Sequence, residues 1–160
     1  MNNEIIKLCF FGPSGSGKST IESILKNCLW QKGYWTHIVN MAYPLHNIQD
    51  SAYEILELEN KAQDGVFLQF LVNHFGIKVL CDLFTKKVKH LENWWITNEY
   101  ITRKEKDTHL IVNTDCRNNS YLTLKEEGFV FVKVDTEPYL RLSRLKKRQD
   151  ITTAELSKYV

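Results

Sequence analysis

A run of eight residues near the start of the chain has the types and spacing of a phosphate-binding loop. It fits the pattern G-x-x-x-x-G-K-[ST] in full and reads Gly12-Pro13-Ser14-Gly15-Ser16-Gly17-Lys18-Ser19, with Thr20 directly after it. Glycines let the backbone turn tightly and bring its N–H groups toward phosphate oxygens. A lysine here reaches the β- and γ-phosphates of a nucleotide, and the serine hydroxyl is a ligand for Mg²⁺. We predict that residues 12–20 bind nucleotide phosphates, with Lys18 as a catalytic group and Ser19 at the metal.

Two further candidates, Asp115 and Arg117, directly follow an apolar run at residues 109–114. In open parallel sheets, ligands bind at the carboxyl ends of the strands. A carboxylate there can hold Mg²⁺ or orient an attacking oxygen, and a guanidinium can fork onto a phosphate. We expect Asp115 to act at the metal and the reacting oxygens, and Arg117 to bind an acceptor phosphate. The structural alternative is a helix-capping aspartate beside a solvated arginine.

Three arginines near the C-terminus, Arg141, Arg144 and Arg148, recur at i, i+3 and i+7 and therefore share one helix face. Arginines gathered beyond a phosphate loop suit a lid that neutralises a transferring phosphoryl group. We take Arg144 as a catalytic candidate, and Arg141 and Arg148 as candidates for substrate binding. A solvated charged face is the alternative for each of them.

These groups need strands and helices in alternation to hold them. Short apolar runs predict four strands, at residues 5–11, 34–40, 109–114 and 129–134. Helical spacing of apolar residues predicts helices at about residues 21–29, 45–56, 65–90 with a break near Gly76, 93–103, 121–127 and 138–149, and a last one from about residue 153. Strands alternating with helices predict an α/β fold, in which a parallel sheet has helices on both faces.

Composition limits the class of protein. The chain has 160 residues, is 43% hydrophobic and 25% charged, and carries a net charge of +2, so we expect one globular domain and no nucleic-acid partner. Its four cysteines are far apart, which excludes C-x-x-C zinc and redox motifs. Neither a signal peptide nor an apolar stretch of 18 residues is present, and we expect a cytoplasmic protein without a membrane partner.

Several segments, in the right order, give the chain a resemblance to the deoxynucleoside monophosphate kinases of phages, and more loosely to phosphomevalonate and dephospho-CoA kinases. The segments are the phosphate loop, Met41-Ala42-Tyr43-Pro44-Leu45, Phe67-Leu68-Gln69-Phe70 with Phe75-Gly76, Trp94-Trp95, Asp115-Cys116-Arg117-Asn118, the apolar run after Gly128, and the arginines from Arg144 to Arg148. Together they cover most of the chain, although only the phosphate loop is highly specific.

The resemblance implies transfer of the γ-phosphoryl group of ATP to a (deoxy)nucleoside monophosphate, with Mg²⁺, on a three-layer P-loop sandwich. By position, Lys18 and Ser19 would serve ATP and Mg²⁺, Asp115 the metal or the reacting oxygens, Arg117 the acceptor, and Arg144 and Arg148 the lid. We expect one domain over residues 1–160, with a core at 1–40 and 105–136. An acceptor-binding helical segment would span 41–104, and a lid with C-terminal helices would span 137–160.

Kinases of this type usually have five parallel strands, whereas this chain has four candidates. We predict a four-stranded parallel sheet in the order 2-3-1-4, in a chain that is either a minimal version or shorter than its relatives. Its fourth strand would be an open edge, along which a homodimer or another partner could pair.

Two positions on the acceptor side depart from the family. The segment Ile77–Phe84 has only Lys78 as a base where the family has arginines, and Asn119-Ser120 stand where a glutamate is common. Two other functions therefore stay open: a kinase of another small phosphorylated metabolite, such as dephospho-CoA or a phosphomevalonate-like compound, and a non-catalytic nucleotide-binding module.

Overall fold

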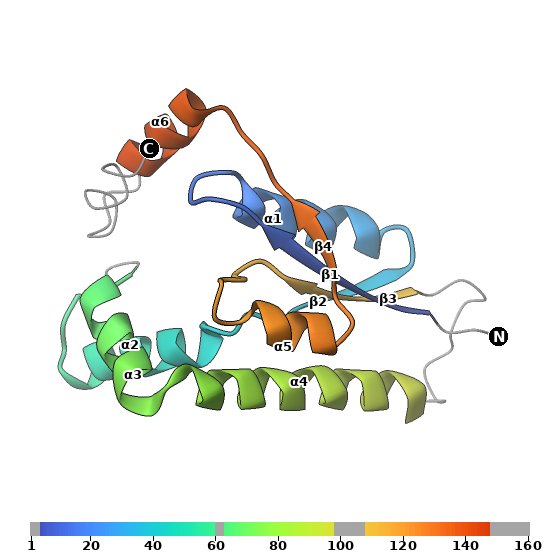
Figure 1. Ribbon diagram of the computed structural model, residues 1–160, viewed down its shortest axis with the longest axis horizontal. Helices are drawn as coiled ribbons and strands as arrows, with labels where there is room; N and C mark the ends of the chain where they lie inside the picture. Colours follow the sequence, from blue (N-terminus) through green and yellow to red (C-terminus); the bar gives the residue numbers. More distant parts are fainter. Residues whose placement is uncertain (1–3, 60–62, 98–107, 148–160) are drawn as a thin grey trace.

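A computed structural model of the chain describes residues 4–59, 63–97 and 108–147 (Figure 1). In chain order its elements are β1 (Ile5–Phe11), α1 (Lys18–Trp30), β2 (Tyr34–Ile38), α2 (Tyr43–Ile55), α3 (Gly65–Phe75), α4 (Ile77–Thr97), β3 (Thr108–Asn113), α5 (Tyr121–Glu126), β4 (Val130–Lys133) and α6 (Pro138–Lys147). The break expected near Gly76 is confirmed, because α3 ends and α4 begins on either side of it. The helix expected from about residue 153 lies outside the described residues.

The four strands form one sheet in the order β2-β3-β1-β4, and every pairing is parallel. This confirms the predicted α/β class, strand number and strand order, with β4 as an edge. In register, Cys9 of β1 lies between Asn113 of β3 and Phe131 of β4. All four strands therefore run toward the same end of the sheet, and the segments that follow them meet there.

The helices cover both faces of the sheet, as predicted. Figure 1 shows α1 on one face, and α5 and the long helix α4 on the other. Lys7 of β1 ties the second layer down, since its ammonium pairs with Glu92 of α4 and donates to the Glu127 carbonyl oxygen. The result is a three-layer arrangement in which a loop after each strand reaches one edge of the molecule.

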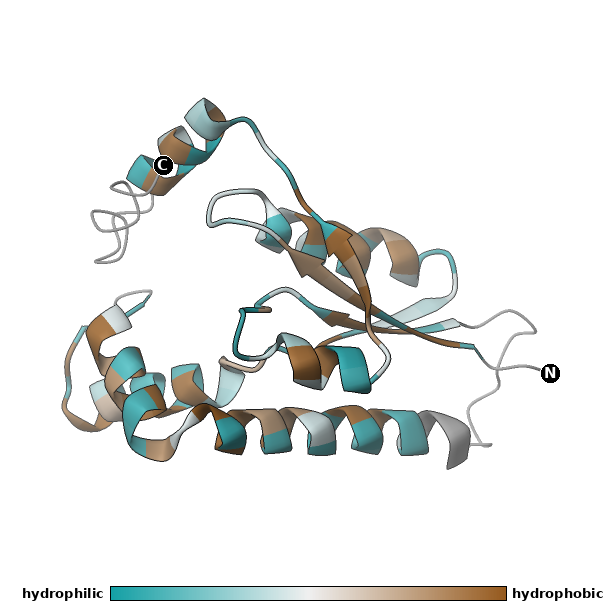
Figure 2. Ribbon diagram, in the orientation of Figure 1, coloured by the Kyte–Doolittle hydropathy of each residue, from teal (hydrophilic) through white to brown (hydrophobic). Residues whose placement is uncertain are grey.

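The main core lies between the sheet and the layer formed by α4 and α5. Cys9, Ile111, Phe84, Val88 and Leu124 are all buried there. A smaller core, with Leu45, Leu68, Leu71 and Leu80 as its buried residues, joins α2 and α3 to the start of α4. In Figure 2, β1 and β4 are largely brown, while α4 alternates between brown and teal turns.

Helices α3 and α4 meet at a bend of 90°. Within the described residues, no single helix combines the length and the apolar character needed to cross a membrane; only the pair Gly65–Phe75 and Ile77–Trp94, counted together across this bend, meets those criteria.

Candidate nucleotide-binding site

The predicted phosphate loop joins β1 to α1, as its sequence requires. Gly12 must be glycine, because a Cβ there would lie 2.3 Å from the Val134 carbonyl oxygen on the segment after β4. Gly15 has φ +79°, and a Cβ there would lie 3.0 Å from the Arg141 carbonyl oxygen. The loop ends where α1 begins at Lys18, so the free amide groups of that helix N-terminus adjoin it.

The Lys18 side chain folds back over this loop. Its ammonium group donates to the carbonyl oxygens of Gly12, at 2.6 Å, and Pro13, at 3.0 Å, with the Ser16 hydroxyl 3.5 Å away. The positive charge is thereby held at the loop, beside the N-terminus of α1. Both features attract anions, so the loop suits phosphate groups.

Helix α6 brings two of the three predicted arginines to the same loop. Arg141 Nε donates to the Ser14 carbonyl oxygen at 3.3 Å, and Arg144 Nη1 donates to the Gly15 carbonyl oxygen at 3.0 Å. The Thr136 hydroxyl donates to the Ser16 carbonyl oxygen at 2.7 Å. These contacts bring two guanidinium groups to the loop that also holds the Lys18 ammonium, while their role as a lid stays a prediction. Arg148 lies outside the described residues.

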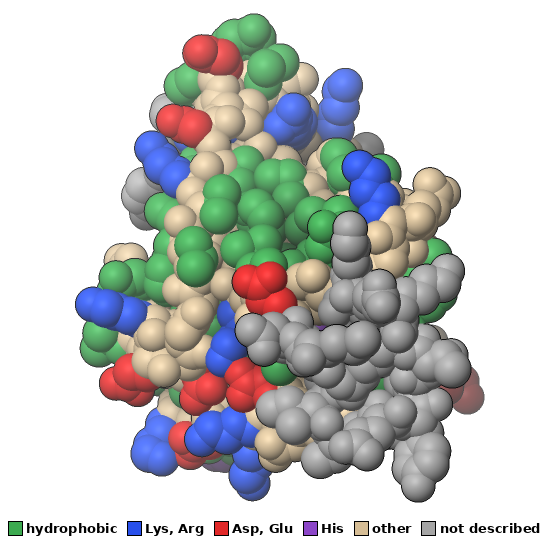
Figure 3. All heavy atoms as spheres, turned by 90° about the vertical axis from the view of Figure 1, so that its right-hand side faces the viewer, with side chains coloured by type: hydrophobic (Ala, Val, Ile, Leu, Met, Phe, Trp, Pro, Cys, Tyr) green, Lys and Arg blue, Asp and Glu red, His purple; other side chains and the backbone are tan. Residues whose placement is uncertain are grey.

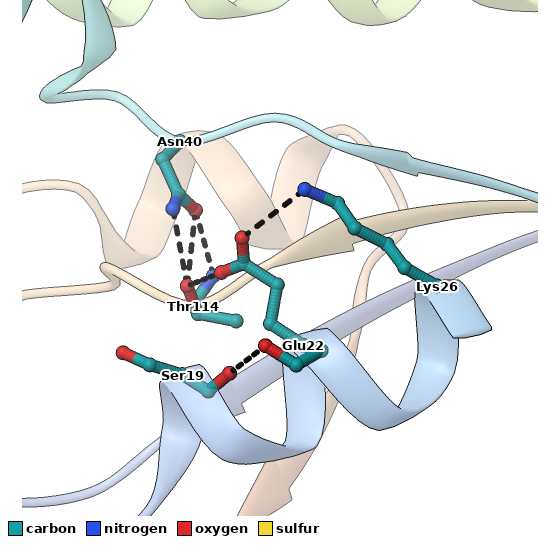
Figure 4. Close-up of polar contacts among 6 residues, drawn as sticks. Ser19, Glu22, Lys26, Asn40 and Thr114 are labelled. Atoms are coloured by element: carbon teal, nitrogen blue, oxygen red, sulfur yellow. Dashed lines mark hydrogen bonds and ion pairs between the residues drawn. The ribbon is translucent and has the colours of Figure 1, made fainter. Parts of the chain in front are cut away.

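A polar cluster lies beside the loop, where β2 and β3 end (Figure 4). Thr114 Oγ1 donates to Glu22 Oε2 at 3.0 Å, and Asn40 contacts Thr114 through both ends of its amide. Glu22 is one helical turn after Ser19 on α1, and its carboxylate also pairs with Lys26 at 3.6 Å. Glu22, Asn40 and Thr114 were not among the residues predicted from the sequence, although the i, i+3 spacing of Ser19 and Glu22 was a usable signal.

Asp115 is separate from this cluster. Its Oδ1 accepts from the Met41 amide at 3.1 Å and from Asn113 Nδ2 at 2.8 Å, while Oδ2 accepts from the Ala42 amide at 2.8 Å. The carboxylate therefore anchors the start of α2, which begins at Tyr43. Asp115 thus has a structural contact, while its metal and catalytic role stays a prediction.

Arg117 lies at the other side of the β3 end, in the turn that leads into α5. The turn is well defined, because the Ser120 hydroxyl bonds to both the amide and the carbonyl oxygen of Arg117. Arg117 lines a pocket of about 480 Å³, together with Gly12 of the phosphate loop. Cys116 also lines this pocket, and burial raises the pKa of its thiol, so it is protonated at neutral pH.

The residues present fit a magnesium ion held jointly by protein and substrate. Ser19, Glu22 and Thr114 offer the hydroxyl and carboxylate oxygens that Mg²⁺ prefers. Over the described ranges, no group of three or more His, Cys, Asp or Glu side chains could hold a metal alone. Mg²⁺ usually takes one or two carboxylates plus phosphate oxygens of a substrate, and its binding here stays a prediction.

Comparisons with known proteins add little to this geometry. No family model matches the chain, and no curated protein matches it. Among solved structures, the crystal structure of APE1195 aligns with 96% of this chain and 76% of its own, at 17% identity and a TM-score of 0.42. A likeness this distant bears on neither the activity nor the ligand of the chain.

Proposed function

We propose that the protein is an ATP-dependent phosphotransferase that moves the γ-phosphoryl group of ATP to a (deoxy)nucleoside monophosphate. The observation that carries the proposal is the convergence of three cationic side chains, Lys18, Arg141 and Arg144, on a glycine loop that opens a helix. Phosphoryl transfer is catalysed mainly by positioning and by neutralising charge on the transferring group, and such a loop with its cations supplies both.

Each group has a distinct task in this proposal. Lys18 moves from the carbonyl oxygens of its own loop to the phosphates of ATP, and Arg141 and Arg144 turn from the same loop toward the transferring group. Arg117, which lines a pocket together with Gly12, holds the acceptor phosphate. Ser19, with Glu22 one turn later, holds Mg²⁺, which when bound neutralises charge on the β- and γ-phosphates.

The test is acceptor-dependent release of ADP in a coupled assay. The panel contains ribo- and deoxyribonucleoside monophosphates, dephospho-CoA and phosphomevalonate, so that it also identifies a kinase of another phosphorylated metabolite. We expect ADP release with at least one nucleoside monophosphate. Lys18→Ala should lower turnover on the order of 10²-fold to 10³-fold, because the group that meets the transferring charge is lost. Lys86→Ala, at an exposed position on α4, is the matched control.

A non-catalytic nucleotide-binding module is the second candidate, and the contacts of Asp115 favour it. Both carboxylate oxygens of that residue accept from backbone amides at the start of α2. If Asp115 is essential for transfer, a carboxylate committed to this role leaves a loop that binds ATP without transferring phosphate. The module predicts that ATP raises the melting temperature while no acceptor on the panel releases ADP, and any measurable acceptor-dependent turnover contradicts it.

A further inference from the structure

The pocket beside the phosphate loop has one aromatic wall and one polar wall. Phe11, Tyr121 and Phe131 line the first, and Gly12, Arg117 and Asn118 line the second. Its volume of about 480 Å³ lies within the range of pockets that bind small molecules. It adjoins Gly12, so a ligand bound in it would lie next to the phosphate loop.

The aromatic wall is a connected set of rings. Tyr121 and Phe131 have ring centroids 4.9 Å apart at a tilt of 40°, and Phe11 meets Phe131 edge-on at 6.3 Å. Phe11 and Phe131 pack against the main core, whereas Tyr121 is 41% exposed. A ring fixed on one side and open on the other is suited to stacking on a flat ligand.

The polar wall presents a cation on a fixed backbone. The amide of Tyr121 donates to the Arg117 carbonyl oxygen at 3.0 Å, which adds to the Ser120 contacts of that turn. Arg117 is exposed, and among the described residues its side chain has no hydrogen-bond or ion-pair partner. An arginine in this state binds phosphate without first giving up an internal partner.

We propose that this pocket receives the base of the acceptor nucleotide, with Tyr121 stacking on the base and Arg117 beside the 5′-phosphate. The inference rests on the proposed function and adds the site of the acceptor base. We assign the donor phosphates to a different place. Their proposed cations, Lys18, Arg141 and Arg144, belong to α1 and α6, which lie above the sheet in Figure 1, whereas α5, which begins at Tyr121, lies below it.

The experiment measures equilibrium binding by calorimetry on the full chain, with no ATP present. The ligands are the nucleoside 5′-monophosphates of the panel, ribose 5-phosphate as the base-free control, and, separately, ATP. The variants are Tyr121→Ala, Tyr121→Phe, Arg117→Gln and, as a matched control, Tyr139→Ala at a tyrosine that is 68% exposed.

We expect Tyr121→Ala to raise the Kd of the tightest monophosphate roughly fivefold or more, because stacking of a base on an aromatic ring is lost. Its Kd values for ribose 5-phosphate and ATP should stay near those of the wild type. Tyr121→Phe keeps the ring and should bind like the wild type, as should Tyr139→Ala. Arg117→Gln should weaken monophosphates and ribose 5-phosphate alike, because both carry the phosphate.

Three results would overturn the inference: no binding of any monophosphate by the wild type, unchanged affinities in Tyr121→Ala, or a loss in that variant that falls on ATP or equally on ribose 5-phosphate. Failure of the proposed function looks different. If no acceptor releases ADP while monophosphate binding still depends on Tyr121, the pocket binds the base but the proposed kinase activity is wrong. If transfer occurs with an unchanged acceptor KM in Tyr121→Ala, the kinase activity is correct but the pocket does not bind the base.

Discussion

At the scale of single residues, the site depends on which side chains have their charge free for a ligand. Asp115 is the acidic residue that the sequence favours, yet its oxygens accept from two backbone amides and from Asn113. Glu22 has one oxygen on the Thr114 hydroxyl and the other 3.6 Å from Lys26. Its side chain stays 23% exposed, next to the turn of α1 that carries Ser19. If the loop binds Mg²⁺ as proposed, Glu22 is the better placed carboxylate for it.

A test at Glu22 separates these two carboxylates. Glu22→Gln keeps an oxygen that accepts from Thr114 but removes the charge that attracts the metal. We expect the Mg²⁺ concentration for half-maximal ATP binding to rise roughly tenfold, with ATP affinity unchanged in the absence of Mg²⁺. Calorimetric titrations at several Mg²⁺ concentrations measure both quantities. Glu54→Gln, at an exposed position of α2, is the control, and an unchanged Mg²⁺ dependence in Glu22→Gln would assign the metal elsewhere.

At the scale of elements, α6 completes the loop by docking on it. Leu145 is 2% exposed, and its Cγ lies 3.3 Å from the position that a Cβ on Gly15 would take. This leucine therefore holds the helix so that Arg141 and Arg144 reach the loop carbonyl oxygens. The docking contact is apolar, whereas the two arginine contacts are polar. A substitution at Leu145 can therefore change how the helix is held without removing its positive charges.

Removing the docking contact should free the helix. We expect Leu145→Ala to raise the Kd of ATP roughly tenfold, because neither arginine is then held near the phosphates. Hydrogen exchange of the α6 amides should become faster in the same variant. Leu140→Ala, at a leucine of α6 that is 39% exposed, should change neither quantity. Equal ATP affinity in Leu145→Ala and the wild type would mean that the docked helix has no part in binding.

The edge strand β2 and its neighbour β3 carry a histidine pair, in which His109 is buried and His37 is partly buried. His37 of β2 and His109 of β3 have ring centroids 4.6 Å apart, edge to face. Burial, with a smaller repulsion from His37, lowers the pKa of His109 to about 4, and burial with the nearby Lys87 lowers that of His37. Both rings are therefore neutral in the folded protein at neutral pH, whereas in the unfolded chain they take up protons near pH 6.5.

The pair predicts a stability that depends on pH. The folded pKa is the lower one, so its contribution is fully present above pH 6.5 and is lost as the pH falls toward about 4. The loss from His109 is on the order of 3 kcal/mol, and urea unfolding at a series of pH values measures it. His109→Leu should flatten this dependence, while His90→Gln, at an exposed position on α4, should retain it. A slope that His109→Leu leaves intact would contradict this origin.

At the scale of the whole molecule, α4 connects the two cores. Leu80 belongs to the smaller core with α2 and α3, and Phe84, Val88 and Leu91 belong to the main core under the sheet. The helical segment and the sheet are thereby joined by one continuous helix.

The surface of the molecule also has exposed apolar side chains, and Figure 3 shows a hydrophobic patch with charged groups around it. The edge strand β4 exposes Val130 and Val132. The homodimer or other partner expected along this edge stays a prediction.

Cooperative unfolding follows from this connection. Phe84 is 3% exposed, and Phe84→Ala should lower the free energy of unfolding by about 3–5 kcal/mol, through lost burial and a cavity. Circular dichroism and intrinsic fluorescence should report the same reduced midpoint, because both cores share α4. Phe75→Ala, at a phenylalanine that is 56% exposed, should cost well under 1 kcal/mol. Separate transitions for the two signals would contradict a single cooperative unit.

The sequence by itself determined the parts of this protein that depend on short-range rules. Eight consecutive residues define the loop between β1 and α1, because glycine conformations and a helix start are local properties. Alternating strands and helices predicted the parallel sheet, since crossover connections have a preferred hand. Only the tertiary structure decided which polar groups meet. The Thr114–Glu22 contact and the contacts of Asp115 with the segment before α2 join residues 92 and 73–74 positions apart. Such pairs depend on how layers pack, which no local pattern encodes.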